Sequence, residues 1–374
     1  MTQKNNRTAL IYTLFDKPNF GCFLQVFAMS EVLRSFNFNP FVARIPAVSK
    51  PTAFDEFFYN PYYSIYKNLV KVKAKLFSNQ NRQSTLDHSP EFLESRSHSF
   101  KDAFKCLQVV DPLFSADVSI FGSDEIWNIS NNGFDHYLEY FGYNSPSRIN
   151  IAYAPSIASC RPGLILRDRK RSRLIKKLDF VFPRDSATLD MVNQLRSDHS
   201  NIVVDPTVLI ADWLKYKSQF CLDYDYVLYY GYSPTPKLIK WLKMVAAEHS
   251  LKLICLNFEY SWCDQSIACS PFDFLTVLEK ASFVVTDTFH GCIFSTLLNK
   301  NFVAVDPSKK AYDFMRRFDQ IDIVYSSKQL DDIDDSLSLF HLLTKHSRDM
   351  KIKEARDRSL SLFYEALCAE NERQ

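Results

Sequence analysis

Apolar and polar residues alternate along this chain in blocks, and the blocks predict strands and helices that follow one another. Apolar runs of roughly four to eight residues are typical of buried strands. Between them lie longer segments with apolar residues at helical spacing, such as Leu24, Phe27 and Leu33. We expect strands over 8–15, 40–46, 117–127, 148–158, 179–186, 201–210, 226–232, 251–258, 282–287 and 301–307. We expect helices over 22–36, 170–178, 187–195, 235–250, 271–281 and 291–299.

This alternation indicates an α/β fold in which helices cover parallel sheets. The chain has 374 residues, more than a typical single core, and the strand–helix pattern restarts near residues 213–225. We therefore predict two Rossmann-like domains, 1–212 and 220–335, with a helical insertion over about 50–105. Residues 345–372 form a predicted C-terminal helix that packs on the N-terminal domain, with Phe363 and Leu367 on its apolar face.

Composition and charge exclude several classes of protein. A net charge of +2 gives no general affinity for nucleic acid. Nine cysteines without any CxxC pair argue against a disulfide framework or a zinc site and favour reduced thiols. The N-terminus has no apolar signal-peptide core, and no apolar run reaches the roughly 18 residues of a membrane span. We expect a cytoplasmic protein without a metal or cofactor.

Polar motifs follow the predicted strands at their carboxyl ends, which is where open α/β sheets bind ligands. Caps and turns use the same residue types, so each motif alone has a structural alternative. The motifs are DKPNFGC (16–22), GSDEIWN (122–128), YAPS (153–156), PRDS (183–186), DPT (205–207) and TDTFHG (286–291).

The motif TDTFHG stands where a strand ends and a helix begins. The free N–H groups and positive dipole end of that helix suit an anion, and Gly291 permits close approach of a ligand to the backbone. Asp287 or Thr288 could serve only as the helix cap, and His290 could be an ordinary structural histidine. A histidine beside an anion site can also hold a phosphate and transfer a proton near neutral pH.

Taken in order, these motifs resemble the polysaccharide pyruvyl transferase family over roughly residues 10–325. The sequence departs from the usual family pattern at Cys22, Glu125 and Thr288. The resemblance implies a GT-B-like arrangement of the two domains. It also implies transfer of an enolpyruvyl-derived group from phosphoenolpyruvate to two hydroxyls of a sugar, which forms a pyruvate ketal. The acceptor would belong to a cell-surface or capsular polysaccharide or to its lipid-linked precursor.

The resemblance and the chemistry together assign roles to the motif residues. Arg184 suits a carboxylate or phosphate because a guanidinium forms two parallel bonds to either, although an ion pair is its structural alternative. His290, Arg184 and Asp124 are the expected catalytic residues. The C-terminal domain is the expected donor side, with donor contacts from Thr288, Phe289, His290 and Gly291, and Arg184 of the N-terminal domain is also expected to contact the donor. Acceptor contacts are expected from Asn19, Gly21, Gln25, Ser123, Asp124 and Glu125.

Residues 57–86 carry five basic residues, no acidic residue and several aromatics. Lys67, Lys71 and Lys75 recur every four residues, so a helix would place them in one stripe. Such a helix could lie on the membrane surface near a lipid-linked acceptor, at the inner face of the membrane. Its structural alternative is an ordinary insertion with a solvated charged face.

Three functions stay open at this point. The first is the phosphoenolpyruvate-dependent pyruvyl transferase. The second is a nucleotide-sugar glycosyltransferase of the same architecture, which the lack of a glycine-rich diphosphate loop at 229–236 disfavours. The third is a non-catalytic scaffold of polysaccharide assembly, which the presence of His290 and Arg184 disfavours.

Overall fold

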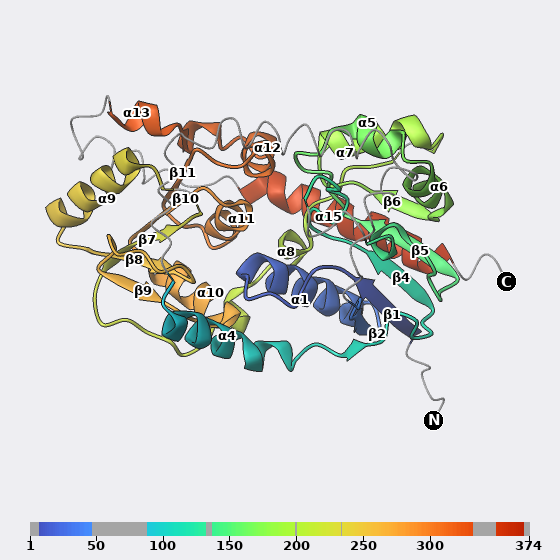
Figure 1. The fold of residues 1–374 in the computed structure, drawn as a ribbon, viewed down its shortest axis with the longest axis horizontal. Helices are drawn as coiled ribbons and strands as arrows, with labels where there is room; N and C mark the ends of the chain where they lie inside the picture. The colour runs from blue at the N-terminus through green and yellow to red at the C-terminus, as the bar shows by residue number, and fades with distance from the viewer. Residues whose placement is uncertain are drawn as a thin grey trace.

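The computed structural model describes residues 7–46, 88–131, 137–198, 200–232, 234–331 and 349–369, which form two parallel six-stranded sheets. The sheets lie beside each other with helices α1 and α8 between them (Figure 1). The N-terminal sheet contains β1 (Arg7–Tyr12), β2 (Phe38–Ala43), β3 (Val109–Val110), β4 (Val118–Phe121), β5 (Ile149–Tyr153) and β6 (Phe180–Phe182). The C-terminal sheet contains β7 (Tyr226–Tyr230), β8 (Lys252–Leu256), β9 (Gln265–Ile267), β10 (Phe283–Thr286), β11 (Phe302–Val305) and β12 (Val324–Tyr325).

Both sheets are doubly wound and have the same topology. The N-terminal order is β3-β2-β1-β4-β5-β6, and the C-terminal order read from β9 is β9-β8-β7-β10-β11-β12. The strand order therefore reverses between β1 and β4 in one sheet and between β7 and β10 in the other. Ligands of such sheets bind beyond the carboxyl ends of the strands at this reversal. The predicted pair of Rossmann-like sheets is confirmed.

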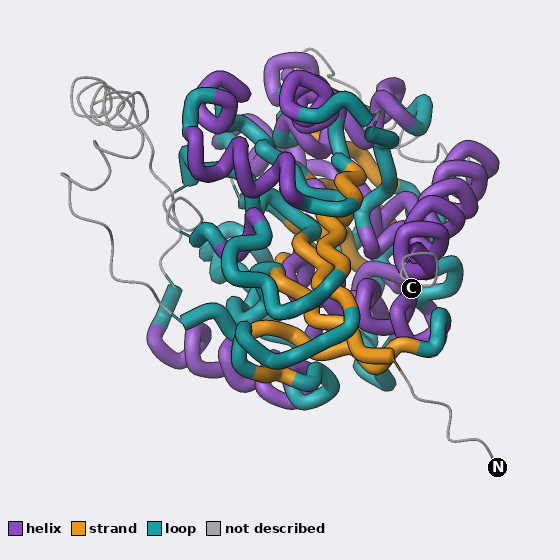
Figure 2. The backbone as a smooth tube through the Cα atoms, turned by 90° about the vertical axis from the view of Figure 1, so that its right-hand side faces the viewer, coloured by secondary structure: helices purple, strands orange, loops and turns teal. Residues whose placement is uncertain are grey.

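Helices cover both faces of each sheet, and Figure 2 shows the strands enclosed between them. The outer face of the N-terminal sheet packs on α5, α6 and α7, and that of the C-terminal sheet on α9 and α13. The other helices form one central layer between the sheets. The helices are α1 (Phe20–Ser35), α4 (Pro90–Phe104), α5 (Pro162–Leu166), α6 (Arg169–Lys177), α7 (Ser186–Leu195), α8 (Pro206–Leu209), α9 (Pro236–Glu248), α10 (Pro271–Lys280), α11 (Phe289–Leu297), α12 (Lys309–Arg317), α13 (Ser327–Asp331) and α15 (Asp349–Cys368).

The alternation of side chains along each strand explains these layers. In β1, Ala9 and Ile11 belong to the central core, whereas Leu10 and Tyr12 belong to the core under α5–α7. Successive residues of a strand point to opposite faces, so a strand buried on both faces reads as an unbroken apolar run. This is why the strands could be located from their sequence.

Aromatic side chains join the two halves in the central layer. The Phe20 ring stacks on Phe274 of α10 at a centroid distance of 4.4 Å and on Phe100 of α4 at 5.5 Å. Phe27 packs edge-on against Tyr216 and Phe272. The two sheets therefore share one continuous apolar core rather than meeting at a polar interface.

The C-terminal helix α15 crosses back to the N-terminal sheet (Figure 1). Phe363 packs on Tyr153 of β5, and the Arg7 guanidinium donates to the Leu367 carbonyl. Phe363 and Leu367, predicted on the apolar face of this helix, lie in the core. No helix in the described part of the chain has both the length and the apolar character needed to cross a membrane.

Two differences from the sequence-based expectations stand out. The strand predicted over 201–210 is wrong: Asp205 caps the short helix α8 and Pro206 is its first residue, so the apolar residues here pack without a sheet partner. The basic stretch 57–86 lies outside the described residues, as does most of the predicted insertion apart from α4. The domain boundaries at 212 and 220 stay a prediction.

Candidate active site

Loops from both sheets converge where the carboxyl ends of their strands face each other. The Asn19 amide, after β1, donates to the Tyr232 hydroxyl, after β7, at 2.9 Å. The Lys310 ammonium, after β11, lies 3.1 Å from the Asp124 carboxylate, after β4. Most of the sequence motifs therefore meet in one region, as the strand-end rule predicts.

His290 occupies the first turn of α11. Thr288 is the N-cap of this helix, and its hydroxyl accepts from the Gly291 N–H at 2.9 Å. The His290 side chain is buried, and its Nε2 atom has no hydrogen-bond partner in the described structure. Burial lowers the pKa of His290 to about 4, although nearby Asp205 and Asp124 act in the opposite direction. The imidazole is therefore neutral at pH 7 here, unlike the near-neutral titration that the sequence suggested.

Gly21 and Gly291 both lie where the packing around His290 is tight. A Cβ atom at Gly21 would lie 2.0 Å from Nδ1 of His290, so α1 approaches the histidine as closely as a glycine permits. A Cβ at Gly291 would lie 2.1 Å from Oγ1 of Thr286. Both glycines therefore let the elements around His290 close together, and the expected contacts of Gly21 with the acceptor and of Gly291 with the donor stay predictions.

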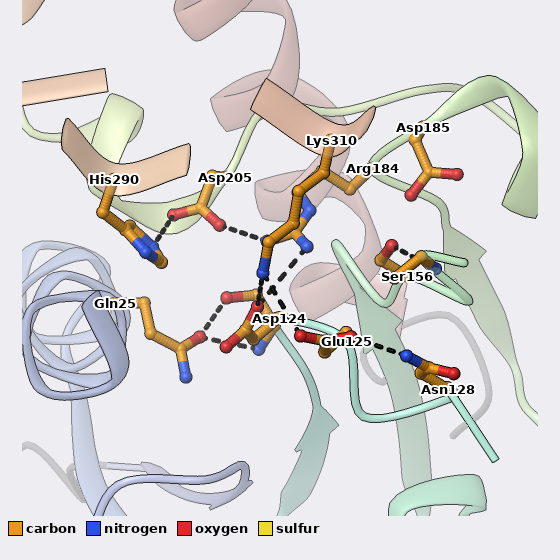
Figure 3. Close-up of polar contacts among 12 residues, drawn as sticks. Gln25, Asp124, Glu125, Asn128, Ser156, Arg184, Asp185, Asp205, His290 and Lys310 are labelled. Atoms are coloured by element: carbon orange, nitrogen blue, oxygen red, sulfur yellow. Dashed lines mark hydrogen bonds and ion pairs between the residues drawn. The ribbon is translucent and has the colours of Figure 1, made fainter. Parts of the chain in front are cut away.

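A buried network of charges joins the loops beside His290 (Figure 3). The Arg184 guanidinium lies 2.8 Å from Asp205 and 3.5 Å from Asp124. Lys310 bridges Asp124 at 3.1 Å and Glu125 at 3.4 Å. Nε2 of His290 is 3.9 Å from Asp205. Two cations thus balance three carboxylates, and the imidazole lies at one end of the network.

This network fixes the ionisation of its members. Burial alone would raise the pKa of Asp124, but Lys310 and Arg184 outweigh burial and hold that pKa well below its usual range. Burial likewise opposes the charge of Lys310, yet Asp124 and Glu125 raise the pKa of its ammonium. Asp124 is therefore a stable carboxylate and a weak base, so its expected part in deprotonating an acceptor is disfavoured.

A cavity of about 370 Å³ opens beside the network. Its walls carry the two cations Lys17 and Lys310, the imidazole of His290, and hydroxyl, amide and carboxylate groups. The volume is within the range of small-molecule sites. The lining residues are Leu14, Lys17, Asn19, Cys22, Asp124, Glu125, Asn131, Tyr230, Tyr232, Asp287, Thr288, Phe289, His290, Ser308 and Lys310.

The predicted acceptor residues divide into two groups. Asn19, Asp124 and Glu125 line the cavity. Gln25 and Ser123 do not line it: the Gln25 amide donates to the Thr13 hydroxyl at 2.7 Å and accepts from the Ser123 N–H at 3.2 Å. Both are buried, so the direct acceptor contact expected of them is corrected to a structural role, in which they tie the loop after β4 to α1.

Arg184 and His290 do not face each other across one cavity, contrary to expectation. Arg184 lines a separate cavity of about 250 Å³, and its guanidinium lies 4.5 Å above the Phe289 ring. Phe289 and Lys310 form the wall between the two cavities. Asp205 lies between the two residues, 2.8 Å from the Arg184 guanidinium and 3.9 Å from Nε2 of His290. Arg184 therefore neutralises buried carboxylates and does not line the larger cavity. Asp185, the next residue along the chain, caps α7.

None of the motifs found in the sequence contains Lys310, whose ammonium contacts the Asp124 and Glu125 carboxylates of the larger cavity. It follows β11 in the stretch DPSKKAYDF, at the carboxyl end of a predicted strand. The strand-end rule applied to this strand as well would have found it. Within the described residues, no group of three histidine, cysteine, aspartate or glutamate side chains is arranged to hold a metal ion.

Comparisons with known proteins concern the family and the fold of the chain. The family model described as polysaccharide pyruvyl transferase matches residues 19–309. A solved UDP-GlcNAc 2-epimerase from Neisseria meningitidis bound to UDP-GlcNAc has 9% sequence identity and a TM-score of 0.52, covering 97% of this chain and 99% of the other. Another UDP-N-acetylglucosamine 2-epimerase has 10% identity and a TM-score of 0.51, covering 99% and 98%. These similarities show a GT-B-like fold. No curated protein matches the sequence.

Proposed function

The chain belongs to the polysaccharide pyruvyl transferase family, and on that premise we propose that it uses phosphoenolpyruvate to form a pyruvate ketal on a sugar. The acceptor is a cell-surface or capsular polysaccharide or its lipid-linked precursor. The observation that carries the proposal is the buried, unpartnered Nε2 of His290 beside a cavity that also contains Lys310. An anionic donor would supply the partner that this nitrogen lacks.

The donor is proposed to bind against His290 and Lys310, with its phosphate or carboxylate near the first turn of α11. Its negative charge would raise the pKa of His290, so that the neutral imidazole gains a proton as the donor binds. His290 can then protonate the methylene carbon of phosphoenolpyruvate, which leaves C2 electrophilic. The first sugar hydroxyl adds to C2 and returns a proton to His290. The bond from C2 to the phosphate oxygen then breaks, the second hydroxyl adds to C2 to close the ketal, and its proton leaves with the phosphate.

The carboxylates have a supporting role in this proposal. Glu125 lines the cavity, lies 3.4 Å from Lys310 and accepts from the Asn128 amide at 2.6 Å. It is placed to hold an acceptor hydroxyl, together with Asn19. Asp124 keeps Lys310 in position through the 3.1 Å contact. Arg184 acts as a positioning residue, because it neutralises Asp124 and Asp205 from the other side.

We place the reaction in the cytoplasm, at the inner face of the membrane. All nine cysteines are free thiols, which suits a reducing compartment. The stretch 57–86 is proposed to contact the membrane near a lipid-linked acceptor, and charge reversal at Lys67, Lys71 and Lys75 should then weaken binding to anionic vesicles.

Replacement of His290 tests the proposed chemistry. His290→Asn keeps some hydrogen bonding but cannot transfer the proton, so we expect a loss of about 10²–10⁴-fold in the rate of ketal formation. The rate is measured as phosphate release from phosphoenolpyruvate, with mass detection of the ketal. His249→Asn, at the end of α9, is the matched control and should keep the wild-type rate. Near wild-type turnover by His290→Asn with an unchanged melting point would contradict the assignment.

The alternative is a nucleotide-sugar glycosyltransferase, because the similar solved structures include an enzyme bound to UDP-GlcNAc. Thermal shift separates the two functions, since a ligand that binds only the folded state raises the melting temperature. We expect phosphoenolpyruvate to raise it, and UDP- and GDP-sugars to leave it unchanged. The opposite pattern would favour the glycosyltransferase.

A further inference from the structure

Residues 161–177 hold an unusual concentration of positive charge. They contain eight lysines and arginines and one aspartate, a net charge of +7, whereas the whole chain carries only +2. The other 357 residues therefore have a net charge of −5. An asymmetry of this size indicates an interaction with an anionic partner rather than general solubility.

These residues form α5 and α6 on the outer face of the N-terminal sheet, away from the central layer (Figure 1). All the cations of the stretch are exposed except Arg171, which pairs with the helix cap Asp168 at 2.5 Å. A groove of about 850 Å³ lies between α6 and the loop after η1 (Glu139–Phe141). Its lining residues are Gly142, Tyr143, Asn144, Ser145, Asn150, Arg169, Lys170, Arg173, Leu174, Lys177 and Leu178.

The charges of α6 oppose the stability of the helix itself. Arg169, Arg173 and Lys177 lie four residues apart in one row, where like charges repel. Arg169 also stands in the first turn, where the helix dipole disfavours a cation. Within the described part of the chain these three side chains form no ion pair. Neither the fold nor the proposed cavity accounts for this basic row.

The groove combines these cations with apolar surface. Leu174 and Leu178 form part of its wall. The Tyr143 ring is exposed at the edge of the groove, and the Lys170 ammonium lies 4.6 Å from the centroid of this ring. Basic residues beside an aromatic and aliphatic rim suit the boundary between lipid headgroups and acyl chains. A nucleic acid would need the phosphate contacts but not the aliphatic wall.

We propose that α6 and the loop at 142–145 dock the protein on an anionic membrane surface, with lipid phosphate groups held by Arg169, Arg173 and Lys177. This inference rests on the proposed function, since a lipid-linked acceptor would lie at that surface. It assigns membrane contact to a described surface separate from residues 57–86.

The test is co-sedimentation of the full-length protein with vesicles, without donor or acceptor. Vesicles of phosphatidylcholine containing phosphatidylglycerol are compared with vesicles of phosphatidylcholine alone. The variant Arg169→Gln, Arg173→Gln, Lys177→Gln should bind the anionic vesicles about 100-fold more weakly, because each basic residue contributes roughly fivefold. Its melting temperature should not fall, since the repulsion along the row is removed. High salt should weaken wild-type binding in the same way.

The matched control is Lys237→Gln, Lys240→Gln, Lys243→Gln, which removes three exposed lysines from α9 on the other half. It should keep wild-type vesicle binding. Equal binding by the α6 variant and wild type would overturn the proposal, as would tighter binding to duplex DNA than to anionic vesicles, or full displacement by glycerol phosphate. Because no catalysis is measured, an enzyme inactive toward phosphoenolpyruvate could still confirm the docking surface, and the two proposals can fail separately.

Discussion

Gly21 of α1 and His290 of α11 come from different halves of the chain and touch without space for a methyl group. We predict that Gly21→Ala displaces the imidazole, because the added Cβ would lie 2.0 Å from its Nδ1 atom. The variant should lose at least about tenfold in affinity for phosphoenolpyruvate and in ketal formation, if His290 binds the donor. Gly163→Ala is the control, since an added Cβ there would have no described atom within 4 Å apart from its chain neighbours and the backbone of its own helix. Equal donor affinity in both variants would show that the contact has no part in binding.

The depressed pKa of His290 also predicts how stability depends on pH. Between pH 6.5 and about 4 the unfolded chain binds a proton that the folded protein excludes, so the free energy of unfolding falls as the pH drops through this window. The full loss is roughly 3 kcal/mol, and it levels off below the folded-state pKa. Denaturant unfolding at several pH values measures it. His290→Asn should flatten this part of the profile; the same slope in both proteins would place the titration elsewhere.

At the scale of elements, the first turn of α12, directly after β11, places the Lys310 ammonium in the wall of the larger cavity. Lys310 bridges Asp124 and Glu125, and we predict that Lys310→Met weakens phosphoenolpyruvate binding roughly 10- to 100-fold, the usual value of a charge-assisted hydrogen bond. Titration calorimetry measures the affinity. Lys309→Met is the adjacent control, because Lys309 is exposed and lines neither cavity beside the charge network. If both variants bind alike, Lys310 serves only the carboxylate network.

At the scale of the whole molecule, the central layer joins both sheets into one core. We therefore predict a single cooperative unfolding transition. Phe274→Ala should lower the free energy of unfolding by about 3–5 kcal/mol, since the ring is fully buried against Phe20 and Phe294. Leu113→Ala, at a residue that is 66% exposed, should change it little. Two separate transitions in calorimetry would show that the halves unfold independently.

The sequence by itself determined the alternating elements and the edge at which the site lies. Strands such as β1 and β10 are buried on both faces, so their apolar runs identify them without knowledge of their neighbours. Parallel strands place their following loops at one edge, and this rule led to Asn19, Asp124, Glu125 and His290 around one cavity. It could not show that residues 201–210 lack a sheet partner, because burial and strand pairing look alike in an apolar run.

Only the tertiary structure decided what each polar residue does. Gln25 and Glu125 were both expected to contact the acceptor, yet one is fully buried in hydrogen bonds to Thr13 and Ser123 and the other lines the cavity. Arg184 belongs to a buried network of ion pairs. Gly21 packs directly against His290, and burial lowers the pKa of that histidine to about 4. The physical reason is that hydrogen-bond partners, desolvation and neighbouring charges depend on contacts between residues far apart in the sequence, such as Lys310 and Asp124, which are 186 positions apart. Local patterns in the sequence do not record such contacts.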